Sequence, residues 1–295
     1  MRKRSFRRWR KACEQMIFDA SNRVRLKFVT ACLCELGDRS TQQDRVDWRE
    51  GQNGLFTWAV ADGLGGHDGG DVAADLAVSA ALLAVSLSEP GAVLANTVAV
   101  GLSSACEQVE AEQKHLADPG RARQMATTLA LLVSDGYRVA WGHTGDTRIY
   151  RLRNGRAQRL TQDHTLRAAI GLDDNDKVRV PSSLTSAIGL EAPRLDVSDE
   201  ENLARGDLFL ICTDGLWEHV ALDALCKFAR ETRSVSAWLT RLAGCVQRAG
   251  AAQKDNYSAI AAIAVSDVQD ESSALCQTAG PWWRVVLNVA GSGGN

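Results

Sequence analysis

Five aspartates that lie far apart along the chain share one kind of local setting. They stand at the ends of strand-like segments or in glycine-flanked turns, and they are Asp44, Asp62, Asp146, Asp214 and Asp255. Taken singly, an Asp-Gly pair is most often only a turn. Carboxylates that are buried together, however, repel one another and take up protons unless a cation holds them. The joint pattern therefore favours a cation site.

The donor atoms of such a site would be oxygens, because no His or Cys is interleaved with the aspartates at ligand spacing. Oxygen donors select hard ions, Mg²⁺ or Mn²⁺, over zinc or copper. The glycines after Asp62 would also allow a backbone carbonyl, that of Gly63, to join the shell of an ion. Two ions bridged by one carboxylate hold a hydroxide suited to in-line attack on a phosphoryl group.

Two apolar segments deliver the central acids. Residues 55–61 predict a buried strand that ends on Asp62, and five glycines follow within the next eight residues. Residues 208–213 repeat the pattern and lead into an Asp-Gly-Leu sequence at Asp214. A strand tip that carries an acid and is followed by little side-chain bulk lets a ligand approach both the carboxylate and the backbone.

The remaining pattern predicts an α+β fold. Helical spacing of apolar residues predicts helices over 72–86, 92–116, 221–230 and 234–249. Period-two segments with Asp-Gly and Asn-Gly turns predict an antiparallel meander over 127–160, with further strands over 24–34 and 257–265. Residues 37–45 are expected to form a polar loop, which leads through a second polar stretch into the strand over 55–61. Helices in two pairs and meander-connected strands favour a four-layer α-β-β-α sandwich of two antiparallel sheets with helices outside.

One domain over residues 24–266 fits better than two, because acid-bearing strands stand at both of its ends. The basic residues 1–23 are expected to form a disordered arm, and residues 267–295 a tail. The net charge of -2 gives no overall attraction to nucleic acid, and the chain has no apolar run long enough for a transmembrane segment. Eight cysteines without CxxC pairs favour reduced thiols and a cytoplasmic location.

Eight short motifs resemble, in the same order, those of the metal-dependent serine/threonine protein phosphatases of the 2C type, the PPM family. They are Arg39–Asp44, Val60–His67, Thr127–Leu129, Gly142–Arg148, Leu160–His164, Leu184–Gly189, Gly206–Trp217 and Asp255–Asn256. The second motif, Asp-Gly-Leu-Gly-Gly-His, is similar to the form found in bacterial members of the family.

The resemblance implies a two-metal centre at one end of the sheets. Asp62 would bridge both ions, and Gly63 would offer its carbonyl. Asp214 and Asp255 would complete the shell of one ion. Asp44 would hold the second ion through water.

The resemblance also implies a third, weaker ion and a phosphate-binding residue. Asp146, paired with Asp214, matches the third-ion position of bacterial members. Arg39 matches the arginine that grips substrate phosphate, a task that suits a planar guanidinium. The implied cofactors are two Mn²⁺ or Mg²⁺ ions, with the third ion at Asp146.

Two positions depart from the family pattern. Gln43 stands where a glutamate is usual, which removes one negative charge near the second ion. Leu64 stands where eukaryotic relatives have a histidine that is a candidate general acid. His67 is assigned no proton-transfer role and is expected to brace its loop.

Two functions of different classes follow from these observations. The first is an enzyme, a protein phosphatase that hydrolyses phosphoserine and phosphothreonine by a hydroxide bridging two ions. Its partners would be phosphoproteins made by a serine/threonine kinase, and the chain is expected to be a monomer. The second is a catalytically weak or dead scaffold that binds phosphoproteins, for which Gln43 is the one supporting feature.

A phosphatase that uses a cysteine nucleophile is not expected, because Cys212 lies within a strand and the sequence contains no Cys-x5-Arg loop. The irregular residues 163–193 are expected to influence substrate choice.

Overall fold

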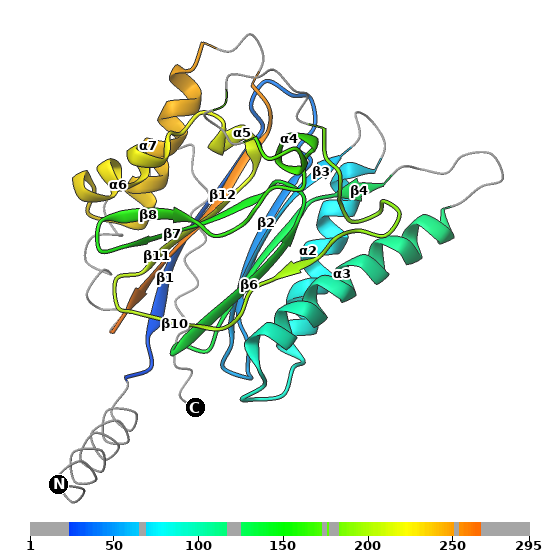
Figure 1. The fold of residues 1–295 in the computed structure, drawn as a ribbon, viewed down its shortest axis with the longest axis horizontal. Helices are drawn as coiled ribbons and strands as arrows, with labels where there is room; N and C mark the ends of the chain where they lie inside the picture. The colour runs from blue at the N-terminus through cyan, green and yellow to red at the C-terminus, as the bar shows by residue number, and fades with distance from the viewer. Residues whose placement is uncertain are drawn as a thin grey trace, which may run out of the picture.

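A computed structural model describes residues 24–64, 69–116, 125–172, 176, 183–250 and 254–266 (Figure 1). The strands are β1 (Lys27–Glu35), β2 (Asp44–Glu50), β3 (Phe56–Leu64), β4 (Ala126–Thr127), β5 (Leu129–Ser134), β6 (Arg138–Thr144), β7 (Arg148–Arg153), β8 (Arg156–Arg159), β9 (Asp196–Val197), β10 (Glu201–Asn202), β11 (Leu208–Cys212) and β12 (Tyr257–Val265). The helices are α2 (Gly70–Ser86), α3 (Leu94–His115), α4 (Leu166–Ala169), α5 (Asp214–Trp217), α6 (Leu222–Glu231) and α7 (Val235–Arg248).

The strands form two antiparallel sheets. One sheet has the strand order β1-β12-β11-β7-β8, and the other has the order β10-β6-β5-β3-β2, with β4 beside β3 and β9 beside β6. Helices α2 and α3 pack on the second sheet, whereas α6 and α7 pack on the first. Figure 1 shows the two helix pairs on opposite sides of the paired sheets. The predicted four-layer α-β-β-α sandwich is therefore confirmed.

Alternation along the central strands divides the apolar side chains among three cores. On β3, Trp58 and Val60 point into the core between the sheets, whereas Ala59 and Ala61 join the core under α2 and α3. On β12, Ile260 lies between the sheets. Because side chains alternate across a strand, a strand buried on both faces reads as a continuous apolar run. This explains why the apolar segments that lead to Asp62 and Asp214 show no alternation with polar residues.

Two expectations about the strands are wrong. Residues 44–50, which span the end of the expected polar loop and the start of the polar stretch after it, form the edge strand β2, which pairs with β3 along its whole length. The expected meander over 127–160 is divided, because β5 and β6 belong to one sheet and β7 and β8 to the other. The chain changes sheets between Thr144 and Arg148, and this crossing carries Asp146.

Smaller differences concern the ends of elements. Strand β3 continues past Asp62 to Leu64, where it pairs with β4. Asp214 begins the short helix α5, which the sequence pattern does not predict. The predicted arm over 1–23, the tail over 267–295 and His67 lie outside the described residues. Within the described ranges, no helix combines the length and the apolar character needed to cross a membrane.

Candidate metal centre

The β2–β3 pairing brings two of the predicted acids together. Asp44 stands directly opposite Asp62 in the strand register. Asp44 is buried, and its Oδ2 accepts a hydrogen bond from the Thr213 hydroxyl at 3.0 Å. Its Oδ1 is also buried and has no hydrogen-bond partner among the described residues. A buried carboxylate oxygen that has no hydrogen-bond donor carries an unfavourable desolvation free energy unless a cation or water binds it.

The backbone around Asp62 is held firmly. Its N–H donates to the Thr128 hydroxyl at 2.9 Å, and its carbonyl accepts from the Thr128 N–H and the Thr127 hydroxyl, each at 2.9 Å. The next residue, Gly63, donates its N–H to the Gln43 carbonyl at 3.1 Å. A Cβ added to Gly63 would lie 2.2 Å from the Gly70 carbonyl oxygen, so only glycine fits. Asp62 therefore projects from a fixed main chain.

Two further acids adjoin strands of the other sheet. Asp214 follows β11 as the first residue of α5, and Asp255 precedes β12. Asp255 accepts from the Arg39 Nη2 at 2.7 Å through one carboxylate oxygen and from the Asn256 N–H at 2.8 Å through the other. The Asn256 side chain accepts from the Gln43 N–H at 2.9 Å and donates to the Leu36 carbonyl at 2.7 Å. These bonds tie the loop before β2 to the loop before β12.

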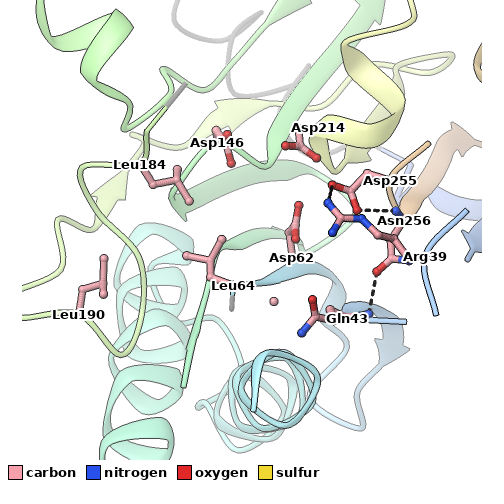
Figure 2. A pocket seen from close by; sticks show the side chains of 11 residues that line it. Arg39, Gln43, Asp62, Leu64, Asp146, Leu184, Leu190, Asp214, Asp255 and Asn256 are labelled. Atoms are coloured by element: carbon pink, nitrogen blue, oxygen red, sulfur yellow. Dashed lines mark hydrogen bonds and ion pairs between the residues drawn. The ribbon is translucent and has the colours of Figure 1, made fainter. Parts of the chain in front are cut away.

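Four acids and Arg39 line one open cleft of about 540 Å³. The lining residues are Arg39, Gln43, Asp62, Gly63, Leu64, Asp146, Leu184, Leu190, Asp214, Asp255 and Asn256. Figure 2 shows the Asp62 carboxylate at the centre, with those of Asp146 and Asp214 near it, Arg39 and Asp255 on one side and the leucines on the other. Asp44, which pairs with Asp62 in the strand register, is not a lining residue. The structure thus gathers every predicted site residue at one end of the sandwich.

Burial and the charges of neighbouring acids raise the pKa of four of these carboxyl groups. Burial, aided by the charges of Asp214 and Asp255, raises the pKa of Asp44 to about 7. Burial and the charge of Asp214 raise the pKa of Asp146 to about 7, and burial and the charge of Glu218 raise that of Asp214 to about 6. The pKa of Asp62 is raised well above its usual range by burial and by the charge of Asp44. Groups held in this way favour either protons or a cation.

The donor set fits hard divalent cations. Carboxylate oxygens from separate strands converge, one buried oxygen of Asp44 has no partner among the described residues, and the main chain at Gly63 is free of side-chain bulk. No thiol or imidazole lines the cleft in the described part of the chain. Oxygen-only sites of this kind suit Mg²⁺ or Mn²⁺.

A second group of possible ligands lies apart from the cleft lining. Atoms of His143, His164 and Asp196 lie within 4.8 Å of one another. The His164 Nδ1 accepts from the Gly145 N–H at 3.2 Å, so its Nε2 carries the hydrogen that is shared with Asp196 at 3.1 Å. The His143 Nε2 lies 2.8 Å from the Gln162 carbonyl and therefore donates to it. Burial lowers the pKa of His143 to about 4. This hydrogen-bonding pattern is that of a structural network.

Sequence reasoning missed several residues that build the site. Thr213 and Thr128 hold Asp44 and Asp62, and Asn256 ties two loops together. Asn256 could have been found, because it directly follows a predicted ligand. Leu184 belongs to one of the quoted motifs and both leucines to the segment expected to influence substrate choice, but their place in the cleft depends on how the chain returns to it after β8.

Comparison with known proteins agrees with this geometry. The family model described as protein phosphatase 2C matches residues 36–256, well over half of the 295 residues. The serine/threonine protein phosphatase PstP of Mycobacterium tuberculosis is 30% identical over 221 residues, covering 72% of this chain and 40% of that protein. The serine/threonine phosphatase Stp of Listeria innocua is 29% identical over 185 residues, covering 60% of this chain and 73% of that protein. The chain thus spans less than half the length of PstP.

A solved structure gives the same result for the fold. The catalytic domain of PstP in complex with two manganese ions superposes with a TM-score of 0.68 at 26% identity, covering 81% of this chain and 99% of that domain. Because the matched residues include the strands and loops that carry Arg39 and all five aspartates, the chain belongs to the protein phosphatase 2C family.

Proposed function

We propose that this protein is a metal-dependent phosphatase that hydrolyses phosphoserine and phosphothreonine on proteins. The observation that carries the proposal is the convergence of Asp62, Asp146, Asp214 and Asp255 on one cleft that Arg39 also lines. A binding module has no need to bring together carboxylates such as those of Asp62 and Asp146, whose pKa values are raised by burial and by the charges of neighbouring acids. A centre that holds cations gains from the same arrangement.

The chain's own residues would divide the work by position. The aspartates would hold two Mn²⁺ or Mg²⁺ ions, with Asp62 between them and a third, weaker ion near Asp146. When bound, these ions supply a hydroxide for in-line attack and neutralise charge on the phosphoryl oxygens. Arg39 is half exposed at the cleft, so its guanidinium is accessible to a phosphoryl group. The manganese ions of the PstP structure support this assignment.

The implied partners are phosphoproteins, and the names of PstP and Stp support serine and threonine as the phosphorylated residues. A serine/threonine kinase would supply these substrates. None of the cysteines in the described ranges forms a disulfide, which supports a reducing, cytoplasmic location.

The proposal is tested by phosphate release from para-nitrophenyl phosphate and from a phosphothreonine peptide. Purified protein should turn over both with Mn²⁺, and EDTA should abolish the turnover. Asp62→Asn should lose activity, whereas the matched exposed change Asp223→Asn, on α6, should retain it. Absence of metal-dependent turnover by folded wild-type protein would leave the phosphoprotein-binding scaffold as the better account.

A further inference from the structure

Several motif residues have no role in the proposed reaction and yet surround one of its acids. Arg148, Asp163, His164 and Trp217 lie outside the cleft lining. All four contact the crossing between β6 and β7 that carries Asp146, or contact one another beside it. Their arrangement shows how this crossing is held.

The indole of Trp217 holds the Asp146 backbone. Its Nε1–H donates to the Asp146 carbonyl at 3.0 Å. Trp217 is the last residue of α5, and Asp214 is the first. One helical turn therefore carries one acid of the cleft and also the side chain that fixes the backbone of a second acid.

Arg148 fixes the orientation of the indole. Its guanidinium carbon lies 3.4 Å from the centroid of the Trp217 ring. The same guanidinium donates to the Asp163 carboxylate through Nε, at 3.0 and 3.2 Å to its two oxygens, and through Nη2 at 2.6 Å. Its Nη1 donates to the Tyr150 hydroxyl at 3.2 Å. The Arg148 side chain is 3% exposed. A buried guanidinium that is bonded in a bidentate manner to a carboxylate is fixed in its plane. The orientation of the Trp217 ring stacked on it is therefore fixed as well.

Gly145 is held from the other side. Its N–H donates to His164 Nδ1 at 3.2 Å, and its carbonyl accepts from the His164 N–H at 3.0 Å. Its φ of +90° and the close approach of Thr128, 2.5 Å from an added Cβ, require glycine. The peptide units on both sides of the Asp146 Cα are thus fixed by partners that do not line the cleft.

We propose that Trp217 is a positioning residue that sets the Asp146 carboxylate relative to Asp214 and thereby the affinity for the ion that these two acids share. The inference rests on the proposed function, because it takes Asp146 to be an ion ligand. Partners that orient a ligand change metal affinity by about 10-fold to about 100-fold when removed. The Trp217 N–H acts in this way through the main chain of Asp146, and Arg148 acts through Trp217.

The experiment compares two tryptophans whose indole N–H donates to a backbone carbonyl. Trp217→Phe removes the indole N–H and keeps an aromatic ring for Arg148. Trp238→Phe is the matched control, because Trp238 donates its indole N–H to the Leu225 carbonyl at 3.1 Å in the core under α6 and α7. Mn²⁺ binding is measured by calorimetry and equilibrium dialysis on the full chain, with Asp146→Asn as the reference for loss of the shared ion. Thermal unfolding in EDTA reports folding separately from metal binding.

Trp217→Phe should lower the affinity for one Mn²⁺ ion by at least about tenfold. The remaining ions keep wild-type affinity, and Trp238→Phe leaves all ions unchanged. Arg148→Lys keeps the charge but lacks the planar guanidinium, and it should lower the affinity for the same ion. If Trp217→Phe does not fold, Arg148→Lys decides the question. Wild-type Mn²⁺ binding in a folded Trp217→Phe or Arg148→Lys protein would overturn the inference while leaving the phosphatase proposal intact. A wild-type protein that binds no Mn²⁺ would overturn both.

Discussion

Asp44 and Asp62 face each other across the β2–β3 ladder as directly paired residues. Opposed residues in an antiparallel pair have Cβ atoms about 4.5–5.5 Å apart, and like charges in such pairs are destabilising. Burial raises the pKa of both carboxyl groups; the charges of Asp214 and Asp255 add to this at Asp44, and the charge of Asp44 adds to it at Asp62. Two adjacent strands therefore present a pair that is stable when protonated or when a cation neutralises it.

The first prediction concerns stability against pH without metal. The folded-state pKa values of Asp44 and Asp146 are about 7, above the unfolded value of about 3.9. Between these values the folded state binds more protons than the unfolded state, so stability falls as pH rises. Thermal unfolding in EDTA should show a transition temperature that decreases from about pH 5 to about pH 8.

Mn²⁺ should reverse this trend, because an ion displaces the same protons. The increase in transition temperature on adding Mn²⁺ should therefore grow as pH rises. Asp146→Asn should flatten the pH dependence in EDTA, since it removes one titrating carboxyl group. A metal-free transition temperature that rises over this range would contradict the prediction.

The second prediction concerns the backbone beside Asp62. Gly63→Ala would place a Cβ 2.2 Å from the Gly70 carbonyl oxygen and 2.8 Å from that of Gln43. Overpacking of this kind costs about 1–3 kcal/mol of unfolding free energy. Denaturant unfolding should show that loss, together with weaker Mn²⁺ binding. Gly250→Ala is the control, because an added Cβ there meets nothing within 4 Å.

The third prediction concerns Arg39, whose Nη2 lies 2.7 Å from Asp255. If Arg39 grips the phosphoryl group, Arg39→Ala should lower kcat/KM for para-nitrophenyl phosphate by about 10-fold to about 100-fold, the range for a hydrogen bond to a charged group. Its stability should hardly change, since exposed ion pairs contribute little. Arg45→Ala, which breaks the exposed pair with Asp75 at 3.1 Å, is the matched control. Equal kcat/KM values for the two variants would show that Arg39 does not bind the phosphoryl group.

The fourth prediction concerns residues 163–193. This segment brings Leu184 and Leu190 into the cleft opposite the Arg39 side (Figure 2). Exchanging it for the segment of a relative, with Asp163 and His164 retained because they help to hold the crossing that carries Asp146, should change the preference among phosphoprotein substrates while hydrolysis of para-nitrophenyl phosphate is largely retained. Steady-state kinetics on two phosphoproteins and the small ester would measure this. Equal loss of both activities would show that the segment acts on the catalytic centre instead.

The sequence predicts the layers well because strands buried on both faces and helices with apolar stripes have clear periodicity. Strand β2 was missed because its only large apolar residues are Val46 and Trp48, which pack against the core between the sheets. Its other residues are polar or charged, as expected at a sheet edge. The edge strand that carries Asp44 therefore has almost the composition of a loop.

The crossing at Gly145 could not be predicted for a different reason. The segments on both sides alternate with period two, and this alternation is the same whether the strands pair with each other or belong to different sheets. Long-range contacts decide the matter, such as the pairing of Cys212 with Arg148 in the first sheet. The acids were identifiable because each stands in a distinctive local sequence, whereas Thr213 and Trp217 act through contacts with residues distant in the chain.

The most direct test of the central claim, that aspartates distant in sequence share divalent cations, is anomalous diffraction from crystals grown with Mn²⁺. Peaks are expected within about 2.3 Å of carboxylate oxygens of Asp62 and of Asp214 or Asp255, close to the usual distance for such ions. Crystals of Asp62→Asn should lose at least one of these peaks. Well-ordered wild-type crystals with no anomalous peak beside Asp62 would contradict the account.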